Sequence, residues 1–142
     1  MKNLKIFIYV ENGQYYLEKK IKLETNINDG IEFNGEKEDI KHIISILLDN
    51  AIKHTKENGK IIVNTIKEKN DIKIEVKNQG EPIPEEERKK IFERFYRVDK
   101  ARNRNEKRYG LGLSIAKGIV EKYKGTIEAG SKDGFTIFIV KI

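Results

Sequence analysis

Three polar residues near position 50 have side chains that suit a magnesium and phosphate site. Asn50, Lys53 and His54 are separated by three and four residues, so on a helix they lie along one side. Magnesium takes one or two protein oxygens and keeps several waters, while an ammonium and an imidazole suit phosphate. The alternative is that all three are ordinary solvated residues beside a buried stripe. Taken alone, this segment favours that alternative.

A second polar feature stands where an alternating apolar run ends. Asn78 has the strand parity of Ile74 and Val76, which predicts that its side chain points toward the core, and a Gly/Pro loop follows over 79–84. A buried amide needs hydrogen-bond partners, and an adenine edge offers an amino donor beside a ring acceptor. The alternative is that Asn78 satisfies backbone groups of the turn, as Asn often does.

A third feature is the run Tyr109-Gly110-Leu111-Gly112-Leu113-Ser114, which opens a predicted helix. Glycines let a backbone approach a ligand closely, and free N–H groups at a helix start attract phosphate. A Gly-x-Gly pair is weak evidence alone, but a cationic segment precedes it. The cations of that segment are Arg97, Lys100, Arg102, Arg104, Lys107 and Arg108. Each of them taken singly is also compatible with a solvated surface loop.

Hydrophobic periodicity predicts the elements that must position these residues. A helix from about 36 to 55 carries one buried stripe, and a second runs over 110–124 and is closed by Gly125. The other predicted elements are a helix over 85–95, a hairpin within 4–23, and strands over 60–66, 71–78, 126–129 and 135–142. This order, without strict βαβ alternation, predicts a two-layer α/β sandwich: a mixed sheet with helices on one face.

The composition narrows the classes of protein to consider. A length of 142 residues suits one domain, and 37% hydrophobic content excludes a disordered chain. The absence of cysteine excludes disulfides and thiol catalysis, and two histidines are too few for a His-rich metal cage. No apolar run reaches the roughly 18 residues that a membrane span needs. The net charge of +6 favours an anionic partner.

Taken together and in order, four segments resemble the ATP-binding catalytic domain of bacterial sensor histidine kinases, a family grouped with gyrase, ATP-dependent chaperones and mismatch-repair ATPases. Segment 47–55 is similar to its asparagine box and segment 78–84 to its first glycine box. Segment 91–99 closely matches the phenylalanine box, and segment 110–117 the second glycine box. The resemblance covers 31–142, and four boxes in the right order are far more specific than one.

The resemblance implies a Bergerat-type fold that binds ATP and Mg²⁺, and it gives each candidate residue a role. Asn50 would hold Mg²⁺, and Lys53 and His54 would approach the phosphates. Asn78 would read the adenine amino group. The other implied nucleotide contacts are Gly80, Ile83, Arg97, Gly110, Leu111, Gly112, Leu113 and Thr136. The catalytic residues among these would be Asn50, Lys53 and Arg97.

Three residues in or just before the boxes depart from the commoner family pattern. Asn78 replaces the commoner Asp, Pro82 replaces a glycine of the first glycine box, and Arg108 replaces the first glycine of the second. We interpret these changes as variants of a working site rather than as its loss. Phe92 and Phe95 are predicted to pack beneath the cationic segment rather than to touch the ligand.

Ile46 bears on what happens to ATP. In the hydrolytic relatives a Glu stands four residues before the metal-binding Asn and activates water, and an isoleucine cannot act as that base. The resemblance therefore implies that ATP is kept for phosphoryl transfer rather than consumed by bulk hydrolysis. Many sensor kinases carry Asn at this position, so Ile46 also departs from the commoner pattern.

The chain lacks the phosphoacceptor box of the family, which reads like Ser-His-Glu-Leu-Arg-Thr-Pro. His42 lies on the predicted first helix and is expected to be structural or exposed. The resemblance implies a protein histidine kinase with a catalytic domain over 29–142 and an N-terminal strand, hairpin or linker remnant over 1–28. Its acceptor histidine would lie on a dimerisation hairpin of the same parent protein or of another chain. A response regulator would act downstream.

We expect this domain in the cytoplasm, or in the cytoplasmic part of a membrane-anchored sensor, with no contact of its own to membrane or nucleic acid.

Three alternative functions stay open. The phenylalanine box argues against a serine kinase of the anti-sigma-factor type. The departures at Asn78, Pro82 and Arg108 keep open a nucleotide-sensing module without transfer. A nucleic-acid binder rests on charge alone and lacks a recognition motif.

Overall fold

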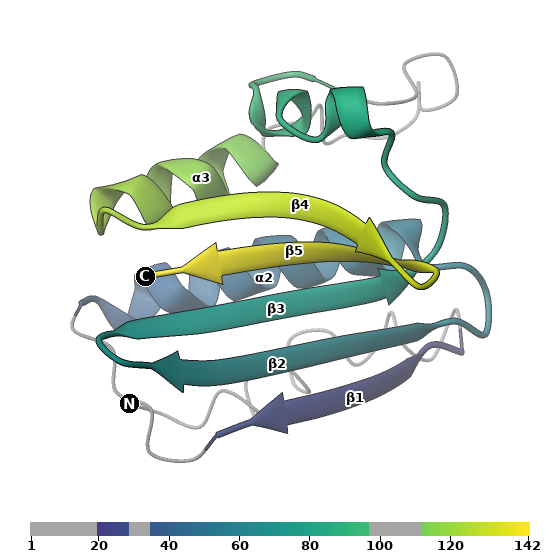
Figure 1. The fold of residues 1–142 in the computed structure, drawn as a ribbon, viewed down its shortest axis with the longest axis horizontal. Helices are drawn as coiled ribbons and strands as arrows, with labels where there is room; N and C mark the ends of the chain where they lie inside the picture. Colours follow the sequence, from purple (N-terminus) through teal and green to yellow (C-terminus); the bar gives the residue numbers. More distant parts are fainter. Residues whose placement is uncertain (1–19, 29–34, 97–111) are drawn as a thin grey trace.

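The computed structural model describes residues 20–28, 35–96 and 112–142. Its elements are β1 (Lys22–Ile27), α2 (Lys37–His54), β2 (Lys60–Glu68), β3 (Asp71–Gln79), the 3₁₀ helices η1 (Glu85–Glu87) and η2 (Lys90–Phe92), α3 (Gly112–Lys122), β4 (Thr126–Lys132) and β5 (Phe135–Lys141). The strands form one sheet in the order β1-β2-β3-β5-β4, in which β1 runs parallel to β2 and the other neighbours are antiparallel. Both α-helices cover one face of it (Figure 1), which confirms the predicted two-layer sandwich with a mixed sheet.

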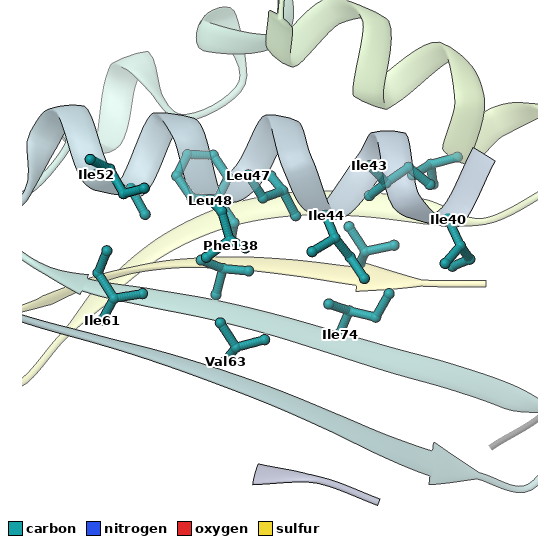
Figure 2. Close-up of a cluster of buried hydrophobic side chains, with 14 of the residues drawn as sticks. Ile40, Ile43, Ile44, Leu47, Leu48, Ile52, Ile61, Val63, Ile74 and Phe138 are labelled. Atoms are coloured by element: carbon teal, nitrogen blue, oxygen red, sulfur yellow. The ribbon is translucent and has the colours of Figure 1, made fainter. Parts of the chain in front are cut away.

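Helix α2 is attached to the sheet along its whole length. Its predicted stripe is buried, and Figure 2 shows that stripe facing the inner side of β2, β3 and β5. The buried residues of α2 are Ile40, Ile43, Ile44, Leu47, Leu48, Ala51 and Ile52, and those of the facing strands include Ile61, Val63, Ile74, Val76, Phe138 and Val140. Burial of this many branched side chains stabilises the layer and sets the position of the polar C-terminal end of α2.

Strand β1 brings part of the 1–28 segment into the same sheet. Its side chains alternate between exposed and half-buried, and Leu23 and Ile27 pack against the core. The register pairs Leu23 with Ile61 of β2. The predicted strand ending at Leu23 is therefore displaced, because the strand begins at Lys22 and continues to Ile27. The rest of the predicted hairpin lies outside the described residues.

The predicted helix over 85–95 is wrong. The structure has two short 3₁₀ turns there, η1 and η2, and only Ile91 and Phe92 are buried among these residues. Two apolar residues make no stripe long enough to hold a full α-helix on the core. Phe92 packs edge-on against Phe138 with ring centroids 6.1 Å apart. Phe95 is 59% exposed, and the cationic segment beneath which both rings are predicted to pack lies outside the described residues.

The residue that ends helix α3 differs from the predicted one. Lys124, rather than Gly125, has the left-handed backbone (φ +60°) that reverses the chain, and its N–H donates to Glu121. Gly125 is needed for another reason: a Cβ atom there would lie 2.3 Å from the backbone oxygen of Lys141. The end of α3 is thereby pressed against the end of β5.

Candidate functional site

The C-terminal end of α2 presents the three polar residues of the asparagine box. Asn50 is half-buried at the border of the core stripe, whereas Lys53 and His54 are exposed. The Nζ atom of Lys53 lies 3.9 Å from a carboxylate oxygen of Asp49, whose side chain is 14% exposed. The structure therefore places an amide, an ammonium and an imidazole within the last turn and a half of one helix.

The Asn78 loop lies directly against this end of α2. The N–H of Lys56 donates to the backbone oxygen of Gln79 at 3.1 Å. A Cβ atom on Gly80 would lie only 2.3 Å from the backbone oxygen of His54. Two features that are far apart in sequence are thus adjacent, and glycine is what permits their close approach.

Replacing Gly80 with alanine tests this approach. Since the added methyl group collides with backbone rather than with a flexible side chain, we expect Gly80→Ala to lower the free energy of unfolding by about 1–3 kcal/mol and to weaken ATP binding more than about tenfold. Thermal unfolding and calorimetric titration with ATP would measure both effects.

Gly118 offers the matched control. It lies exposed within α3, and an added Cβ would meet nothing within 4 Å. Gly118→Ala is expected to raise stability by up to about 1 kcal/mol through helix propensity and to leave ATP binding unchanged. Equal behaviour of the two variants would contradict the close approach at Gly80.

The side chain of Asn78 is buried without a hydrogen-bond partner in residues 20–28, 35–96 and 112–142. It is 1% exposed on the inner face of β3, between Ile61 of β2 and Thr136 of β5 in the strand register. Neither its Nδ2 atom nor its Oδ1 atom finds a donor or acceptor among the described residues. The alternative that Asn78 satisfies turn backbone is therefore not what the structure has. An unpartnered buried polar group costs about 1–3 kcal/mol, which a ligand with a matching edge would offset.

Thr136 and Ile83 hold the loop that follows β3. The hydroxyl of Thr136 donates to the backbone oxygen of Glu81 at 3.2 Å. Ile83 is half-buried and packs against the core, and its backbone oxygen accepts from Nε of Arg88 at 3.2 Å. These contacts fix the loop in place beside the Asn78 amide.

The start of α3 faces α2 one turn before Asn50. A Cβ atom on Gly112 would lie 3.4 Å from Cγ2 of Ile46, and Leu113 is half-buried against the core. Because Ile46 precedes Asn50 by four residues, both lie on the same side of α2. Gly112 and Leu113 therefore lie near the metal-binding candidate. The other candidates of this region, Arg97, Gly110 and Leu111, lie outside the described residues.

The donor set of this site suits a weakly coordinated divalent ion rather than a metal cage. Across residues 20–28, 35–96 and 112–142, no three His, Cys, Asp or Glu side chains gather as a metal-binding group. One amide oxygen, from Asn50, matches the habit of magnesium, which keeps waters and takes phosphate oxygens for the rest of its shell. The chain thus offers a suitable single ligand for Mg²⁺ bound together with a polyphosphate.

Comparisons with known proteins identify the family of the chain. Residues 35–142 match the model of the histidine kinase-, DNA gyrase B- and HSP90-like ATPases. The sensor protein CiaH of Streptococcus pneumoniae is 46% identical over 104 residues, which are 72% of this chain and 23% of CiaH. The catalytic domain of histidine kinase ThkA has a TM-score of 0.85 and 30% identity, over 99% of this chain and 92% of that one. The structure of ThkA in complex with response regulator protein TrrA has a TM-score of 0.82 and 29% identity, over 99% of this chain and 40% of that one.

The chain therefore belongs to the family of histidine kinase-, DNA gyrase B- and HSP90-like ATPases, as its four boxes predicted. Within that family it is a catalytic domain of the sensor histidine kinase type. It spans less than a quarter of the length of CiaH.

Proposed function

We propose that this domain binds ATP with Mg²⁺ and transfers the γ-phosphoryl group to a histidine on a dimerisation hairpin, as the catalytic step of two-component signalling. The observation that carries the proposal is the buried amide of Asn78, whose two polar atoms have no hydrogen-bond partner within the described part of the chain. Adenine would satisfy both, because its amino group donates to Oδ1 and a ring nitrogen accepts from Nδ2.

The phosphate side of the site would be supplied by two helices. Asn50 at the end of α2 would hold Mg²⁺, which neutralises phosphate charge when it is bound. Lys53 and His54 are exposed on the next turn, where they would approach the phosphates. The first turn of α3, at Gly112 and Leu113, would offer backbone N–H groups to phosphate oxygens.

Catalysis by such a domain is mainly positioning and charge neutralisation. The chain would orient the nucleotide at both of its ends. Asn78 would contact the adenine, and Asn50 and Lys53 would act at the phosphates. Gly80, Ile83 and Thr136 would keep the adenine side of the site in shape. The proposed roles of Arg97, Gly110 and Leu111 rest on the family resemblance.

Ile46 supports phosphoryl transfer over hydrolysis. Its side chain faces Gly112 at the start of α3, where a water-activating carboxylate would otherwise stand. We expect slow ATP hydrolysis by the wild-type domain and a rise of at least about tenfold in Ile46→Glu, because that variant introduces a general base. Release of inorganic phosphate from ATP would measure it.

Ile46→Gln is the matched control for that prediction. Glutamine has nearly the size and polarity of glutamate but cannot accept a proton at neutral pH. We expect its hydrolysis rate to stay near that of the wild type. If Gln and Glu raised hydrolysis equally, entry of water rather than a missing base would explain the slow rate, and the proposed role of position 46 would be wrong.

The direct test of the function is transfer to an acceptor. The domain is incubated with radiolabelled ATP, Mg²⁺ and a dimerisation hairpin that carries an acceptor histidine. An acid-labile, alkali-stable label on the hairpin is the expected result. Binding of ATP without any labelled hairpin would instead support a nucleotide-sensing module, the alternative that Asn78, Pro82 and Arg108 keep open.

The proposed partners are that hairpin, in the same parent protein or in another chain, and a downstream response regulator. The complex of ThkA with TrrA supports the second, since ThkA is similar to this chain. None of the described helices has both the length and the apolar content to cross a membrane. We propose a cytoplasmic location, with no contact between this domain and nucleic acid or membrane.

A further inference from the structure

A polar cluster joins the start of α2 to the end of α3, far from the adenine side of the site. One carboxylate oxygen of Asp39 accepts from Nζ of Lys122 at 2.8 Å and from the hydroxyl of Tyr123 at 2.5 Å. The Tyr123 oxygen in turn accepts from the backbone N–H of Glu36 at 3.0 Å. We call Asp39, Lys122 and Tyr123 the interhelix clamp.

Tyr123 uses its hydroxyl both as a donor and as an acceptor. Glu36 is the N-cap residue of α2, and the phenol oxygen of Tyr123 accepts from its backbone N–H. Hydrogen bonding by Lys122 and Tyr123 lowers the pKa of Asp39 below its usual value. The clamp therefore contains a charged carboxylate at neutral pH, and charge-assisted bonds are the stronger ones.

The clamp acts on the end of α3 opposite to the proposed phosphate site. Helix α3 has 11 residues; Ala116 and Val120 on it are buried, and Leu113 and Ile119 are partly buried against the core. The clamp adds a polar constraint on the tilt of the helix to this apolar packing. From Val120 to Gly112 the helix measures about 12 Å, so a tilt of about 10° would displace Gly112 by about 2 Å. Misplacement of this size is enough to weaken a positioned contact.

We propose that Asp39 and Tyr123 are positioning residues for the phosphates: by fixing the C-terminal end of α3 they set where its first turn lies. A Cβ atom on Gly112 would lie 3.4 Å from Cγ2 of Ile46, so this first turn lies close to α2 near Asn50. Clamping the two antiparallel helices at their other ends holds that distance. The inference rests on the proposed function, because the affected ligand group is the triphosphate of ATP.

The test compares two ligands that share the adenine contact but differ in phosphates. ATP and adenosine are titrated into the wild type, Tyr123→Phe, Asp39→Asn and Asp39→Ala, with Mg²⁺ and well below the unfolding temperature. Tyr123→Phe and Asp39→Ala are expected to weaken ATP about fivefold and to change adenosine less than about twofold. Asp39→Asn keeps an acceptor oxygen for Tyr123 and is expected to lose less than Asp39→Ala.

A second readout separates positioning from stability. Amide hydrogen exchange at 112–115 is expected to speed up in Tyr123→Phe, although the change is made at the other end of α3. The control is Asn26→Ala, which removes a 2.8 Å hydrogen bond to Asn64 between β1 and β2. It is expected to alter stability without altering exchange at 112–115 or the ratio of ATP to adenosine affinity.

The outcomes are distinct. If the wild type binds neither ATP nor adenosine, the proposed function fails. If the wild type binds both, and the clamp variants weaken ATP and adenosine equally or not at all, the function stands and the positioning role of the clamp is overturned. Exchange that rises only near 120–125 and 36–39 would likewise overturn it, because the clamp would then be a local tether.

Discussion

Replacing Asn50 with alanine is expected to abolish Mg²⁺-dependent ATP binding and phosphoryl transfer. Asn50 is half-buried on the last turns of α2, and its amide oxygen is the proposed protein ligand for the metal. Magnesium takes few protein ligands, so loss of one is not made up by neighbours. Titration with ATP in the presence and absence of Mg²⁺ should show an affinity that depends on the metal in the wild type and no longer does so in Asn50→Ala.

A control variant and a measurement of stability accompany that prediction. Asn70→Ala changes the same residue type at an exposed turn between β2 and β3, and it should leave metal-dependent binding intact. Thermal unfolding should show that Asn50→Ala is folded, since the buried stripe of α2 is untouched. Survival of both nucleotide affinity and transfer to an added acceptor hairpin in Asn50→Ala would mean that the site has been placed wrongly.

Local pattern was sufficient to predict the elements whose burial repeats along the chain. The stripe from Ile40 to Ala51 predicted α2 within one residue at each end, and period-two alternation predicted the inward direction of Asn78. Such patterns work because one face of each element is buried over several turns or several strand residues. The 85–95 segment lacks that repetition, so Pro84 and three acidic residues suggested a helix that tertiary packing does not support.

The convergence of the site depends on contacts between distant parts of the chain, which local pattern does not contain. Gly80 lies against the end of α2 because α2 packs on β3. The close approach of Gly112 to Ile46 requires the antiparallel packing of α2 and α3. Only the order of the four boxes, taken as a family resemblance, indicated that these pieces share one ligand. The contact between Asp39 and Tyr123 could not be predicted from the sequence, because no local pattern relates two residues so far apart in the chain.

The Asn78 amide carries the proposed function, so its replacement should separate binding from stability. In Asn78→Leu both unpartnered polar atoms give way to methyl groups on a side chain with the same branching. We expect ATP affinity to fall more than about a hundredfold, while the free energy of unfolding of the ligand-free domain rises by about 1–2 kcal/mol. That corresponds to an increase of a few degrees in Tm. Calorimetric titration and thermal unfolding would measure the two changes.

Thr65 provides the matched control because it is the other buried side chain without a partner among the described residues. It is 1% exposed on β2, and no residue that the structure describes donates to or accepts from its hydroxyl. Thr65→Val should stabilise the domain in the same way and leave ATP binding unchanged. Asn78→Asp should retain ATP binding, because a carboxylate still accepts from the adenine amino group, but should destabilise the ligand-free domain by burying a charge. If Asn78→Leu lowered stability and kept ATP affinity, the amide would be part of the core rather than the base of a nucleotide site.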